Sequence, residues 1–480
     1  MTEEPERLTK EQWRQRVIEE GRDEVIHQEM IRLGFWEEKE LSQEEREQIE
    51  KEEAELQQLE KELSKLKRES AKLSDLNYLL KEARKKRIEE SKQRRAKRKA
   101  ERERQQKDAK RRWKEYLAIH IPHAGEGVSA DLQSVEYDEA KLKQLQLPLI
   151  RSAQELASQL GISVSKLKWL TYHRKVATIS HYATFTIPKK DGGKREIAAP
   201  KSDLRQVQEW IQANILSQIP VHPCAFGFVK GKSTVDNAKQ HVQRAAVIKM
   251  DLKDFFSTIT FHRVKGLFQS FGYSGLISTL LALLTTESPR KTVKFNETVY
   301  YVAIGGRRLP QGACTSPTIT NLICRRLDER LARYAQKLGF GYTRYADDLT
   351  FSCNESGLTK IGACLRGARK MIRSEGFKVN HKKTRVLRAS RRQKVTGIVV
   401  NQKPNISRKE LRNFRALLHN VEKNGLEKEN RNQHPDFWGY IRGYTSYIQM
   451  VRPDLGEKFA QQVRRIGEKY GLIATTEVPS

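Results

Sequence analysis

The sequence has few cysteines and no long apolar run, and these two absences exclude whole classes of protein. Its five cysteines are odd in number and never form a C-x-x-C pair; they stand at positions 224, 314, 324, 353 and 364. We therefore expect reduced thiols in the core rather than disulfides or a zinc site. No stretch approaches the roughly 18 consecutive apolar residues of a membrane span. The first residues, MTEEPERLTKEQW, contain no apolar signal core, so we expect a cytoplasmic protein with no membrane segment.

Glycine and proline are absent from residues 35 to 121, which favours a long helix. A heptad seam can be written within it, interrupted by Glu52, Ser70 and Asn77. Its members are Ile49, Leu56, Leu59, Leu63, Leu66, Leu73 and Leu80. Such a seam is typical of a coiled-coil-like helix. The pattern leaves open whether this helix pairs with a second copy, folds back on its own chain or binds another protein.

Acidic residues are outnumbered along the chain. The 480 residues include 91 Lys and Arg against 60 Asp and Glu, a formal net charge of +31, and only 37% are hydrophobic. This excess predicts a polyanionic partner, either nucleic acid or an anionic membrane surface. It is largest between Lys81 and Lys114, which contain 18 basic residues and 6 acidic ones. Such a run can be a solvated helical face, but its density favours contact with phosphates along a basic helix.

Composition also divides the chain into segments. Residues 1–118 are expected to form a basic helical extension, residues 119–150 a linker that contains Pro, Gly and Ser, and residues 151–178 a small helical segment. From residue 179, hairpins alternate with helices: YATFTIPKK and REIAAP flank the turn residues DGG, and AAVIKMDL predicts a buried strand. This order predicts an α+β fold. After Asn405, amphipathic helices are expected to the end.

Two adjacent aspartates interrupt the strand-forming stretch YTRYADDLTFSC, residues 342–353. Asp347 and Asp348 repel each other, so the stretch is either a polar hairpin turn or a cation site. A third carboxylate, Asp251, follows the apolar residues of AAVIKMDL. If the two segments are neighbouring strands, three carboxylates converge, and such a cluster is stable only when a hard cation neutralises it. The sequence therefore predicts a metal site built from these three residues.

Three motifs in this order resemble the palm of reverse transcriptases: KMDLKDFF at 249–256, LPQGACTSP at 309–317 and YADD at 345–348. Two shorter elements resemble the retron members of that family. They are the N-A-x-x-H pattern at 237–241 and Val-Thr-Gly at 395–397. A lone Y-x-D-D is weak evidence, but three palm motifs in register are specific.

The resemblance implies a right-hand polymerase fold. Fingers and palm are expected over residues 179–400, and a helical thumb with a C-terminal RNA-binding region over 401–480. Nothing is implied for residues 1–175, because the long helical N-terminal part departs from compact retron enzymes.

The resemblance also implies the ligands of the divalent ions that join nucleotide to primer. Asp251 and Asp347 would be the primary ligands, Asp348 would complete the cluster, and the backbone carbonyl of Leu252 would touch the ion on the nucleotide side. Two Mg²⁺ ions are expected, with Mn²⁺ as an alternative. Lys383, in GFKVNHKKTRV, is expected either to protonate pyrophosphate or to contact phosphate.

A nucleotide pocket is implied in the same way. Lys189 and Arg195 lie in IPKKDGGKREI, which looks like the fingertip hairpin that holds the β- and γ-phosphates; the alternative is exposed hairpin charge. Gln311 would line the sugar and 3′-hydroxyl pocket, and Gly312 would let backbone approach closely. Phe256 matches the steric gate that excludes a 2′-hydroxyl by volume; the alternative is a core phenylalanine.

The two retron-like elements have less defined roles. Asn237 and His241 lie four residues apart, on one face if the segment is helical. The resemblance implies that they support either template RNA or the fold beside the palm, and a structural histidine is an open alternative. Val395, Thr396 and Gly397 match the element at the start of the thumb and are expected to contribute to the RNA side of the enzyme.

As a retron reverse transcriptase, the protein would copy a structured noncoding RNA that serves as template and primer. Synthesis would start from an internal guanosine 2′-hydroxyl, use dNTPs and give a branched RNA–DNA hybrid, multicopy single-stranded DNA, in anti-phage defence. An effector protein and self-association through the N-terminal helix are further expected partners. The alternatives are a group II intron maturase-like or other bacterial reverse transcriptase, and a nucleic-acid-binding scaffold with an inactive palm.

Overall fold

The computed structural model describes residues 9–35, 43–70, 76–188 and 192–472. The chain divides into two compact units. The helical unit comprises Met1–Gln133 with Ser152–His173, and the mixed unit comprises Ser134–Arg151 with Arg174–Ser480. A search of the described ranges for a helix both long and apolar enough to span a bilayer finds none.

The helical unit follows the pattern of the N-terminal sequence. Its helices are α1 (Lys10–Glu20), α2 (Arg22–Arg32), α3 (Gln43–Ser70), α4 (Leu76–Ile119), α6 (Ala153–Gln159) and α7 (Val164–Thr171). Thr9 and Gln12 form a capping box that starts α1, and Gly21, with φ of 87°, separates α1 from α2. The helix predicted between residues 35 and 121 is confirmed as α3 and α4, and residues 36–42 and 71–75 lie outside the described ranges.

The heptad seam predicted on these helices is partly open to solvent, since Leu63 and Leu80 are half-buried and three other members are exposed. Leu56, Leu59 and Leu66 on α3 are 41%, 48% and 61% exposed. Leu73 lies outside the described residues. Pairing of the seam with a second copy or with another protein therefore remains a prediction.

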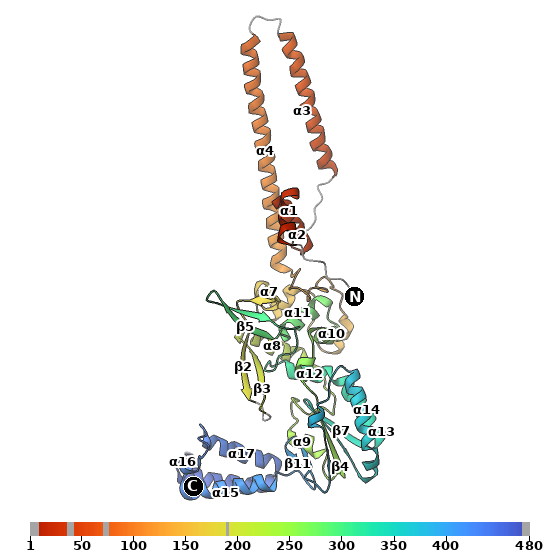
Figure 1. Cartoon of the computed structure of the whole chain (residues 1–480), viewed down its shortest axis with the longest axis vertical. Coiled ribbons are helices and arrows are strands. Elements are labelled where there is room, and N and C mark those ends of the chain that lie inside the picture. Colours follow the sequence, from red (N-terminus) through yellow and green to blue (C-terminus); the bar gives the residue numbers. More distant parts are fainter. Residues whose placement is uncertain (1–8, 36–42, 71–75, 189–191, 473–480) are drawn as a thin grey trace. The chain divides into compact units, whose positions relative to one another are not determined.

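The mixed unit combines four antiparallel sheets with helices (Figure 1). Its N-terminal elements are α5 (Glu139–Gln144), β1 (Val176–Ala177), β2 (Tyr182–Pro188), β3 (Lys194–Pro200), α8 (Ser202–Asn214), η1 (Leu216–Gln218) and α9 (Thr234–Lys239). The central elements are β4 (Ala246–Asp251), η2 (Phe256–Thr258), α10 (Phe261–Ser270), α11 (Gly275–Thr285), β5 (Arg290–Phe295), β6 (Thr298–Ala303), α12 (Ser316–Ile323), α13 (Arg325–Leu338), β7 (Phe340–Tyr345) and β8 (Asp348–Cys353). The C-terminal elements are η3 (Glu355–Lys360), α14 (Ile361–Ser374), η4 (His381–Lys383), β9 (Arg385–Arg388), β10 (Lys394–Val395), β11 (Ile398–Val399), α15 (Arg408–Asn424), α16 (Leu426–Glu429), α17 (Phe437–Val451) and α18 (Pro453–Lys469). The α+β class predicted from the sequence is confirmed.

The largest sheet carries the candidate site. Its strand order is β7-β8-β4-β9, and each neighbouring pair is antiparallel. Val247 and Ile248 on β4 are fully buried, as the run of apolar residues predicts. Helix α13 packs along β7, and α14 packs against α13. Leu327, Leu331 and Ala335, four residues apart on α13, form its buried face.

Two hairpins form the other end of the mixed unit. Strands β2 and β3 pair from Tyr182 opposite Pro200 to Pro188 opposite Lys194, which confirms the hairpin predicted around DGG. Strands β5 and β6 form a second hairpin that also pairs with β1. Every residue of α11 is buried. Helix α11 is therefore part of the hydrophobic core of this region.

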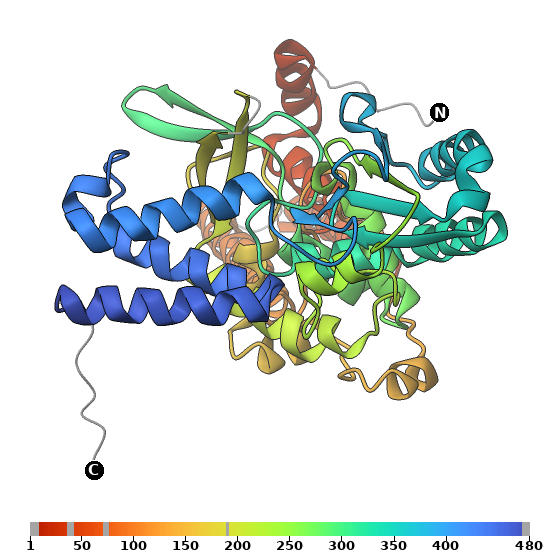
Figure 2. The same cartoon turned by 90° about the horizontal axis from the view of Figure 1, so that it is seen from below.

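Three long helices, α15, α17 and α18, and the short α16 complete the C-terminal end. Ser407 and Glu410 form a capping box that starts α15. Helices α17 and α18 pack side by side, and α15 contacts α18 (Figure 2). Their buried residues share one hydrophobic cluster with Val395 and Ile398, on β10 and β11, and with Val247 on β4. The helical bundle predicted after Asn405 is thus joined to the large sheet by a continuous core.

The segment predicted to be a linker, 119–150, is partly folded into the mixed unit. Leu142 and Ile150 are fully buried. The backbone N–H of Asp138 donates to the carbonyl of Gly272 at 2.8 Å. The prediction of a linker is therefore wrong for residues 134–151. The Pro and Gly residues of the segment suggested a linker, but the apolar side chains of LKQLQLPLI pack into the mixed unit.

All five cysteines are free thiols, as expected, and Cys324, Cys353 and Cys364 are buried. Cys314, by contrast, is exposed rather than in the core. Disulfides therefore make no contribution to the stability of this fold.

Candidate active site

The paired aspartates lie at a tight hairpin between β7 and β8. Tyr345 pairs with Asp348, so Ala346 and Asp347 form the turn. Ala346 has φ of 55°, a conformation that turn geometry requires and that β-branched residues avoid. A Cβ on Gly227 would lie 2.6 Å from the backbone nitrogen of Ala346. Glycine at 227 therefore lets a neighbouring loop pack directly against this turn.

The third carboxylate lies on the adjacent strand. Strand β4 pairs with β8 so that Asp251 is directly opposite Asp348, a relation that places Cα atoms about 4.5–5.5 Å apart. The backbone N–H of Leu252 donates to the carbonyl of Asp347 at 3.0 Å. The sheet register therefore brings together the three aspartates that the sequence selects.

The electrostatics of this cluster are unfavourable without a cation. Burial and the neighbouring Asp348 raise the pKa of Asp347, and Asp251 adds to the effect. Burial, with Asp251, also raises the pKa of Asp348. Lys383 Nζ donates to Asp251 Oδ2 at 3.0 Å, and this hydrogen bond raises the pKa of Lys383. The lysine offsets part of the negative charge but leaves Asp347 and Asp348 to repel each other.

The side chains as they stand do not form a closed ligand set. In the described part of the chain, no group of three or more Asp, Glu, His or Cys side chains is arranged to hold a metal ion. One oxygen of Asp251 is taken by Lys383. The donors nevertheless fit a hard divalent cation, because carboxylates and a backbone carbonyl are the oxygen ligands that such ions prefer.

A buried ion pair lies directly beneath the turn, and the sequence motifs did not reveal it. Arg344 and Asp328 are both fully buried. Arg344 Nη2 donates to Asp328 Oδ2 at 2.7 Å, and Arg344 Nη1 donates to Asn321 Oδ1 at 2.9 Å and to the carbonyl of Ala346 at 3.2 Å. Tyr342 Oη also donates to Asp328, at 2.8 Å. The one visible signal was an arginine within an apolar strand next to YADD.

A pocket of about 230 Å³, whose lining includes none of the three aspartates, contains two of the expected nucleotide-binding residues, Arg195 and Gln311. The carbonyl of Gln311 accepts a hydrogen bond from the N–H of Ala198 at 2.7 Å. A Cβ on Gly312 would lie 2.8 Å from Ile197 Cγ2. Gly312 therefore permits a close approach, as expected, although the approaching group here is strand β3. Lys189 lies outside the described residues.

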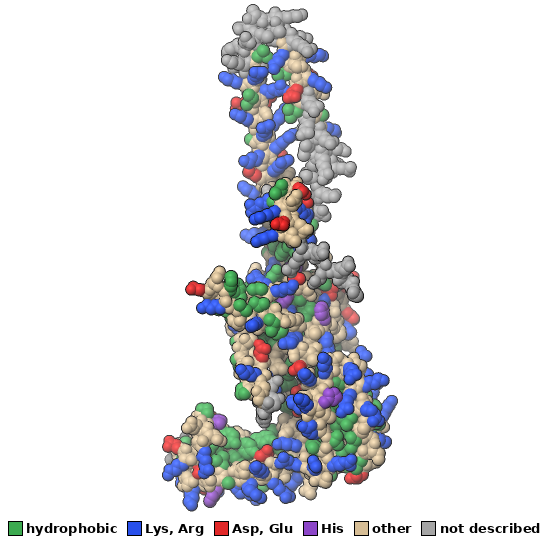
Figure 3. Space-filling view, in the orientation of Figure 1, with side chains coloured by type: hydrophobic (Ala, Val, Ile, Leu, Met, Phe, Trp, Pro, Cys, Tyr) green, Lys and Arg blue, Asp and Glu red, His purple; other side chains and the backbone are tan. Residues whose placement is uncertain are grey.

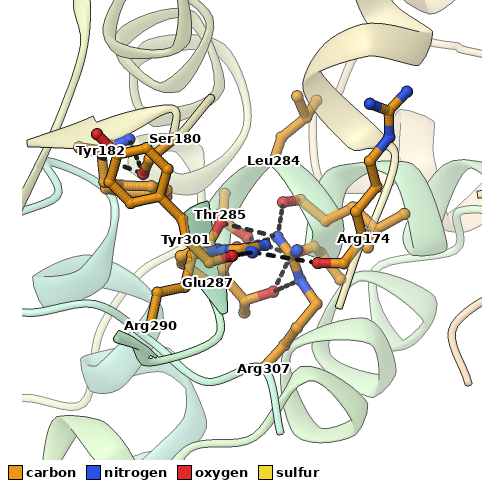
Figure 4. A network of polar contacts seen from close by, with 12 residues as sticks. Arg174, Ser180, Tyr182, Leu284, Thr285, Glu287, Arg290, Tyr301 and Arg307 are labelled. Carbon is orange, nitrogen blue, oxygen red and sulfur yellow. Dashed lines mark hydrogen bonds and ion pairs between the residues drawn. The ribbon is translucent and has the colours of Figure 1, made fainter. Parts of the chain in front are cut away.

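Glu287 and Arg290 also line this pocket, and together with Arg307 they belong to a network of polar contacts (Figure 4). Arg290 Nε donates to Glu287 Oε1 at 2.8 Å, and Arg307 lies 3.9 Å from the other oxygen of Glu287. Arg307 also donates to the carbonyl of Leu283 at 2.6 Å. Sequence reasoning missed these residues, because ESPR and GGRRLP match no catalytic pattern.

Phe256 lies at the start of η2, five residues after Asp251. It is partly exposed, whereas its neighbour Phe255 is 3% exposed and packs on Phe377. The ring of Phe256 contacts Phe228, with centroids 6.4 Å apart. Of the two adjacent phenylalanines, Phe255 belongs to the core, and Phe256 keeps a free surface.

The two retron-like elements meet in the interior. Asn237 and His241 are fully buried. His241 hydrogen-bonds through Nδ1 to Ser352 Oγ and through Nε2 to Thr343 Oγ1, both at 2.7 Å. Because neither side chain is accessible, the structure favours the structural alternative over direct contact with template RNA.

The Val-Thr-Gly element packs against α9, the helix that contains Asn237. Val395 is fully buried in the cluster that joins sheet and thumb. Thr396, with φ of 45°, donates from Oγ1 to the carbonyl of Thr234 at the start of α9, at 3.0 Å. Gly397 adopts φ of 93°. The Val-Thr-Gly element and the helix that carries Asn237 therefore contact each other, although 162 positions separate Thr234 from Thr396. We call this contact the joint.

The burial of His241 leads to a pH prediction. Burial lowers the pKa of His241 to about 3, against about 6.5 for an exposed histidine. The unfolded chain therefore binds a proton that the folded chain does not, and stability falls as the pH drops below about 6.5. We expect a loss of about 2 kcal/mol from this group between pH 7 and pH 5.

Urea unfolding of the wild type and of His241→Gln at both pH values checks this expectation. Glutamine keeps hydrogen-bonding groups but does not titrate, so the variant should be less stable at pH 7 and show a smaller loss on acidification. An equal pH dependence in the two proteins would contradict the assignment.

A groove of about 420 Å³ lies on the thumb beside Gly397. Tyr440, Tyr444 and Tyr447 of α17 line it, with ring centroids 6.1 Å apart for the first pair and 5.9 Å for the second. Burial, together with Glu410, raises the pKa of Tyr444 to about 12. Tyr444 therefore remains neutral, and the three rings present flat faces and hydroxyl groups at a groove next to the Val-Thr-Gly element.

Comparison with known proteins places this geometry in a family. Residues 187–400 match the family model described as reverse transcriptase (RNA-dependent DNA polymerase). The retron Mx162 reverse transcriptase of Myxococcus xanthus is 42% identical over 376 residues, which cover 74% of this chain and 76% of that protein. The retron Mx65 enzyme of the same organism is 40% identical over 333 residues, covering 69% and 76%. The retron Ec86 enzyme of Escherichia coli is 32% identical over 344 residues, covering 71% and 97%.

A solved structure of telomerase from Candida albicans is similar at 12% identity, with a TM-score of 0.36, covering 62% of this chain and 64% of that one. The palm motifs and the sequence matches together define an RNA-directed DNA polymerase with a right-hand fold. The chain belongs to the retron reverse transcriptases. As such it is a polymerase that works on nucleic acid, and the maturase and inactive-scaffold alternatives are set aside.

Proposed function

We propose that the enzyme copies a structured noncoding RNA from an internal guanosine 2′-hydroxyl into a branched RNA–DNA hybrid, multicopy single-stranded DNA. Family membership supports the retron assignment. The observation that carries the catalytic part is the register of β4 on β8, which sets Asp251 opposite Asp348 and beside Asp347. A role in anti-phage defence with an effector protein, self-association through the N-terminal helices and a cytoplasmic location are expectations from the family and the sequence.

Reverse transcriptases use divalent metal ions, and we propose two Mg²⁺ here, with Mn²⁺ as a substitute. Asp251, Asp347, Asp348 and the carbonyl of Leu252 would hold them. The raised pKa values of Asp347 and Asp348 support this, because a carboxylate cluster held at such a cost fits a cation partner. Bound ions would activate the attacking hydroxyl and stabilise the leaving oxygen.

Lys383 is proposed to interact both with the aspartate cluster and with the phosphates of the nucleotide. In the structure its ammonium group bonds to Asp251 at 3.0 Å, which offsets part of the negative charge of the cluster. The Lys383 side chain is 57% exposed, so it is free to turn toward a phosphate. An ammonium group with a raised pKa stays protonated at neutral pH and suits the donation of a proton or a hydrogen bond to pyrophosphate.

The pocket that contains Arg195 and Gln311 is proposed to hold the incoming dNTP. Arg195, with Lys189 of the same hairpin, would bind the β- and γ-phosphates, because phosphoryl transfer needs fixed positive charge at those oxygens. Gln311 would contact the sugar. The ion pair of Glu287 and Arg290, whose side chains are 12% and 11% exposed, fixes two lining residues relative to each other, which supports a preformed pocket.

Phe256 is proposed to exclude ribonucleotides. Phe256→Ala should open space for a 2′-hydroxyl and raise the ratio of rNTP to dNTP incorporation by about 10–200-fold, the range expected when a pocket loses steric selection. Single-nucleotide extension with matched rNTP and dNTP measures this ratio as kcat/KM.

Phe256→Tyr is the control, because it keeps the ring and should keep the discrimination. An Ala variant with unchanged discrimination would return Phe256 to a packing role.

The tyrosine groove of the thumb is proposed to contact RNA. Aromatic rings stack on bases and hydroxyl groups bond to phosphates and 2′-hydroxyls, which suits the wide minor groove of an A-form duplex or a stem-loop. Its position next to Gly397 supports this, because the Val-Thr-Gly element then sets the groove relative to the palm. Val395 and Thr396 would contribute by holding this joint rather than by touching RNA.

The test of the proposed function is the nucleic acid that co-purifies with the enzyme expressed beside its own chromosomal flanking sequence. We expect one discrete DNA species, shortened but not released by RNase, because a 2′–5′ bond joins it to a guanosine of the RNA. The Asp347→Asn protein should carry the RNA without the DNA. DNA with an ordinary free 5′ end would contradict priming from a 2′-hydroxyl while leaving the polymerase assignment intact.

A further inference from the structure

Helix α4 presents a long basic surface that the polymerase domain does not account for. Every residue from Ile88 to Lys107 is exposed. We call these residues the basic stretch; they span about 30 Å along the helix axis. Figure 3 shows Lys and Arg side chains along this part of the chain. The stretch lies outside residues 187–400, which match the reverse transcriptase family.

Positive charge in the basic stretch is dense and lies on all sides of the helix. Between Ser91 and Ala100 there are six basic residues and no acidic residue. Successive residues of a helix point about 100° apart, so Lys92, Lys97 and Arg98 point to three different sides. Like charges one turn apart, such as Arg95 and Lys99, destabilise an isolated helix. A polyanion that binds there would relieve this repulsion.

The composition of the stretch decides between classes of polyanion. A helix that binds a membrane surface needs an apolar face opposite its basic one, and a protein partner needs apolar anchors at the centre of its interface. From Ile88 to Lys107 the only apolar side chains are Ile88, Ala96 and Ala100. Neither requirement is met, whereas a phosphate backbone requires only positive charge at intervals.

We propose that α4 is a second nucleic-acid-binding site, which holds duplex RNA by its phosphate backbone independently of the polymerase site. A duplex carries one negative charge per about 1.7 Å of axis, so about 30 Å presents about 18 phosphates to this stretch. Contacts of lysine and arginine with phosphates carry no sequence information, and the basic stretch contains no aromatic side chain that could stack on bases. Binding is therefore strong at low salt, indifferent to sequence and tolerant of any duplex RNA.

The experiment uses the full-length protein and a variant in which five residues of the stretch become glutamine: Lys92, Arg94, Arg95, Lys97 and Lys99. Glutamine has a helix propensity similar to that of lysine and arginine, so the helix content by circular dichroism should be unchanged. Fluorescence anisotropy measures the Kd for a blunt 20-base-pair RNA duplex between 50 and 300 mM salt. We expect a loss of affinity of about tenfold or more at 100 mM salt and a fall of about two to three in the slope of log Kd against log salt.

A matched control changes charge in the other direction. Glu89→Gln, Glu90→Gln and Glu101→Gln together should tighten binding of the same duplex. Extension of a short preannealed primer on an RNA template should be unchanged in both variants, because the palm is untouched. If a variant lost primer extension but bound the RNA duplex as expected, the defect would lie in the polymerase site and would not contradict the proposal for α4.

Three probes separate the classes of partner: a DNA duplex of equal length, polyglutamate of equal charge and phosphatidylserine vesicles. The proposal holds if the glutamine variant loses affinity for the RNA duplex far more than for polyglutamate or vesicles; an equal loss for DNA widens the ligand to any duplex. Unchanged affinity and salt slope for duplex RNA would overturn it. So would equal losses for polyglutamate or vesicles, because they would mark the stretch as a site for another class of polyanion.

Discussion

Asp347→Asn should reduce primer extension at least about a thousandfold while leaving the protein as stable as the wild type or more so. The loss follows if Asp347 is a ligand of the ions, since their charge stabilisation is worth several kcal/mol, and each 1.36 kcal/mol is a factor of ten in rate. The stability gain follows from the raised pKa of Asp347 in the metal-free fold. An ionised group whose folded pKa is raised opposes folding above that pKa, so a neutral amide removes the opposition.

The rate of single-nucleotide addition in Mg²⁺ and the melting temperature in EDTA are the two measurements. Glu355→Gln is the matched control, because Glu355 is exposed, lies seven residues after Asp348 beyond the end of β8 and also exchanges a carboxylate for an amide. The control should retain activity within a few-fold. An Asp347→Asn enzyme that still extended a primer at the wild-type rate would refute the catalytic assignment.

Arg344→Met should destabilise the fold by about 3–5 kcal/mol, the usual cost of leaving one partner of a buried pair uncompensated. Asp328 would remain fully buried without its bidentate partner. The double variant Arg344→Met, Asp328→Asn removes both charges and keeps an oxygen for the hydroxyl of Tyr342. It should recover most of the lost stability, because a neutral pair carries no uncompensated charge.

Activity should not recover in the double variant, and this separates positioning of the turn from simple stability. The carbonyl of Ala346 would still lack the hydrogen bond from Arg344, so the turn that carries Asp347 would be less constrained. Urea unfolding gives the stabilities, and primer extension at saturating dNTP gives kcat at a temperature where both proteins are folded. If the single variant loses less than about 1 kcal/mol, the pair is not a strong support. If the double variant regains the full rate, the bond to Ala346 has no positioning role.

Features that depend on nearby residues could be predicted from the sequence. The β2–β3 hairpin follows from strand-forming residues around DGG, and β4, β7 and β8 follow from apolar runs of strand length. The cluster of Asp251, Asp347 and Asp348 followed from the same patterns, since acidic residues at strand ends have few stable arrangements. The roles expected for Lys189 and the pairing of the heptad seam are still predictions, since the first lies outside the described residues and the second depends on a partner.

Other expectations failed or changed because composition does not report packing. Residues 134–151 contain turn-forming residues, but buried leucine and isoleucine side chains tie them to the mixed unit. Lys383 bonds to Asp251, a contact that its motif did not indicate, and its role at a phosphate is still a prediction. Asn237 and His241 have the polar side chains of a binding motif, and both are in the interior.

The sequence by itself determined which chemical groups this protein carries: the three carboxylates, the β2–β3 hairpin with its basic residues and the basic stretch of α4 can all be recognised from residue types and short spacings. Only the tertiary structure decided which polar groups are enclosed. Arg344 reaches Asp328 across 16 positions, and Thr396 reaches Thr234 across 162. Whether a side chain is buried depends on which distant segments pack over it. The desolvation free energy of a buried charge is offset only when folding brings an oppositely charged partner next to it. The sequence shows which residues are charged, but it does not show which of these charges the fold buries.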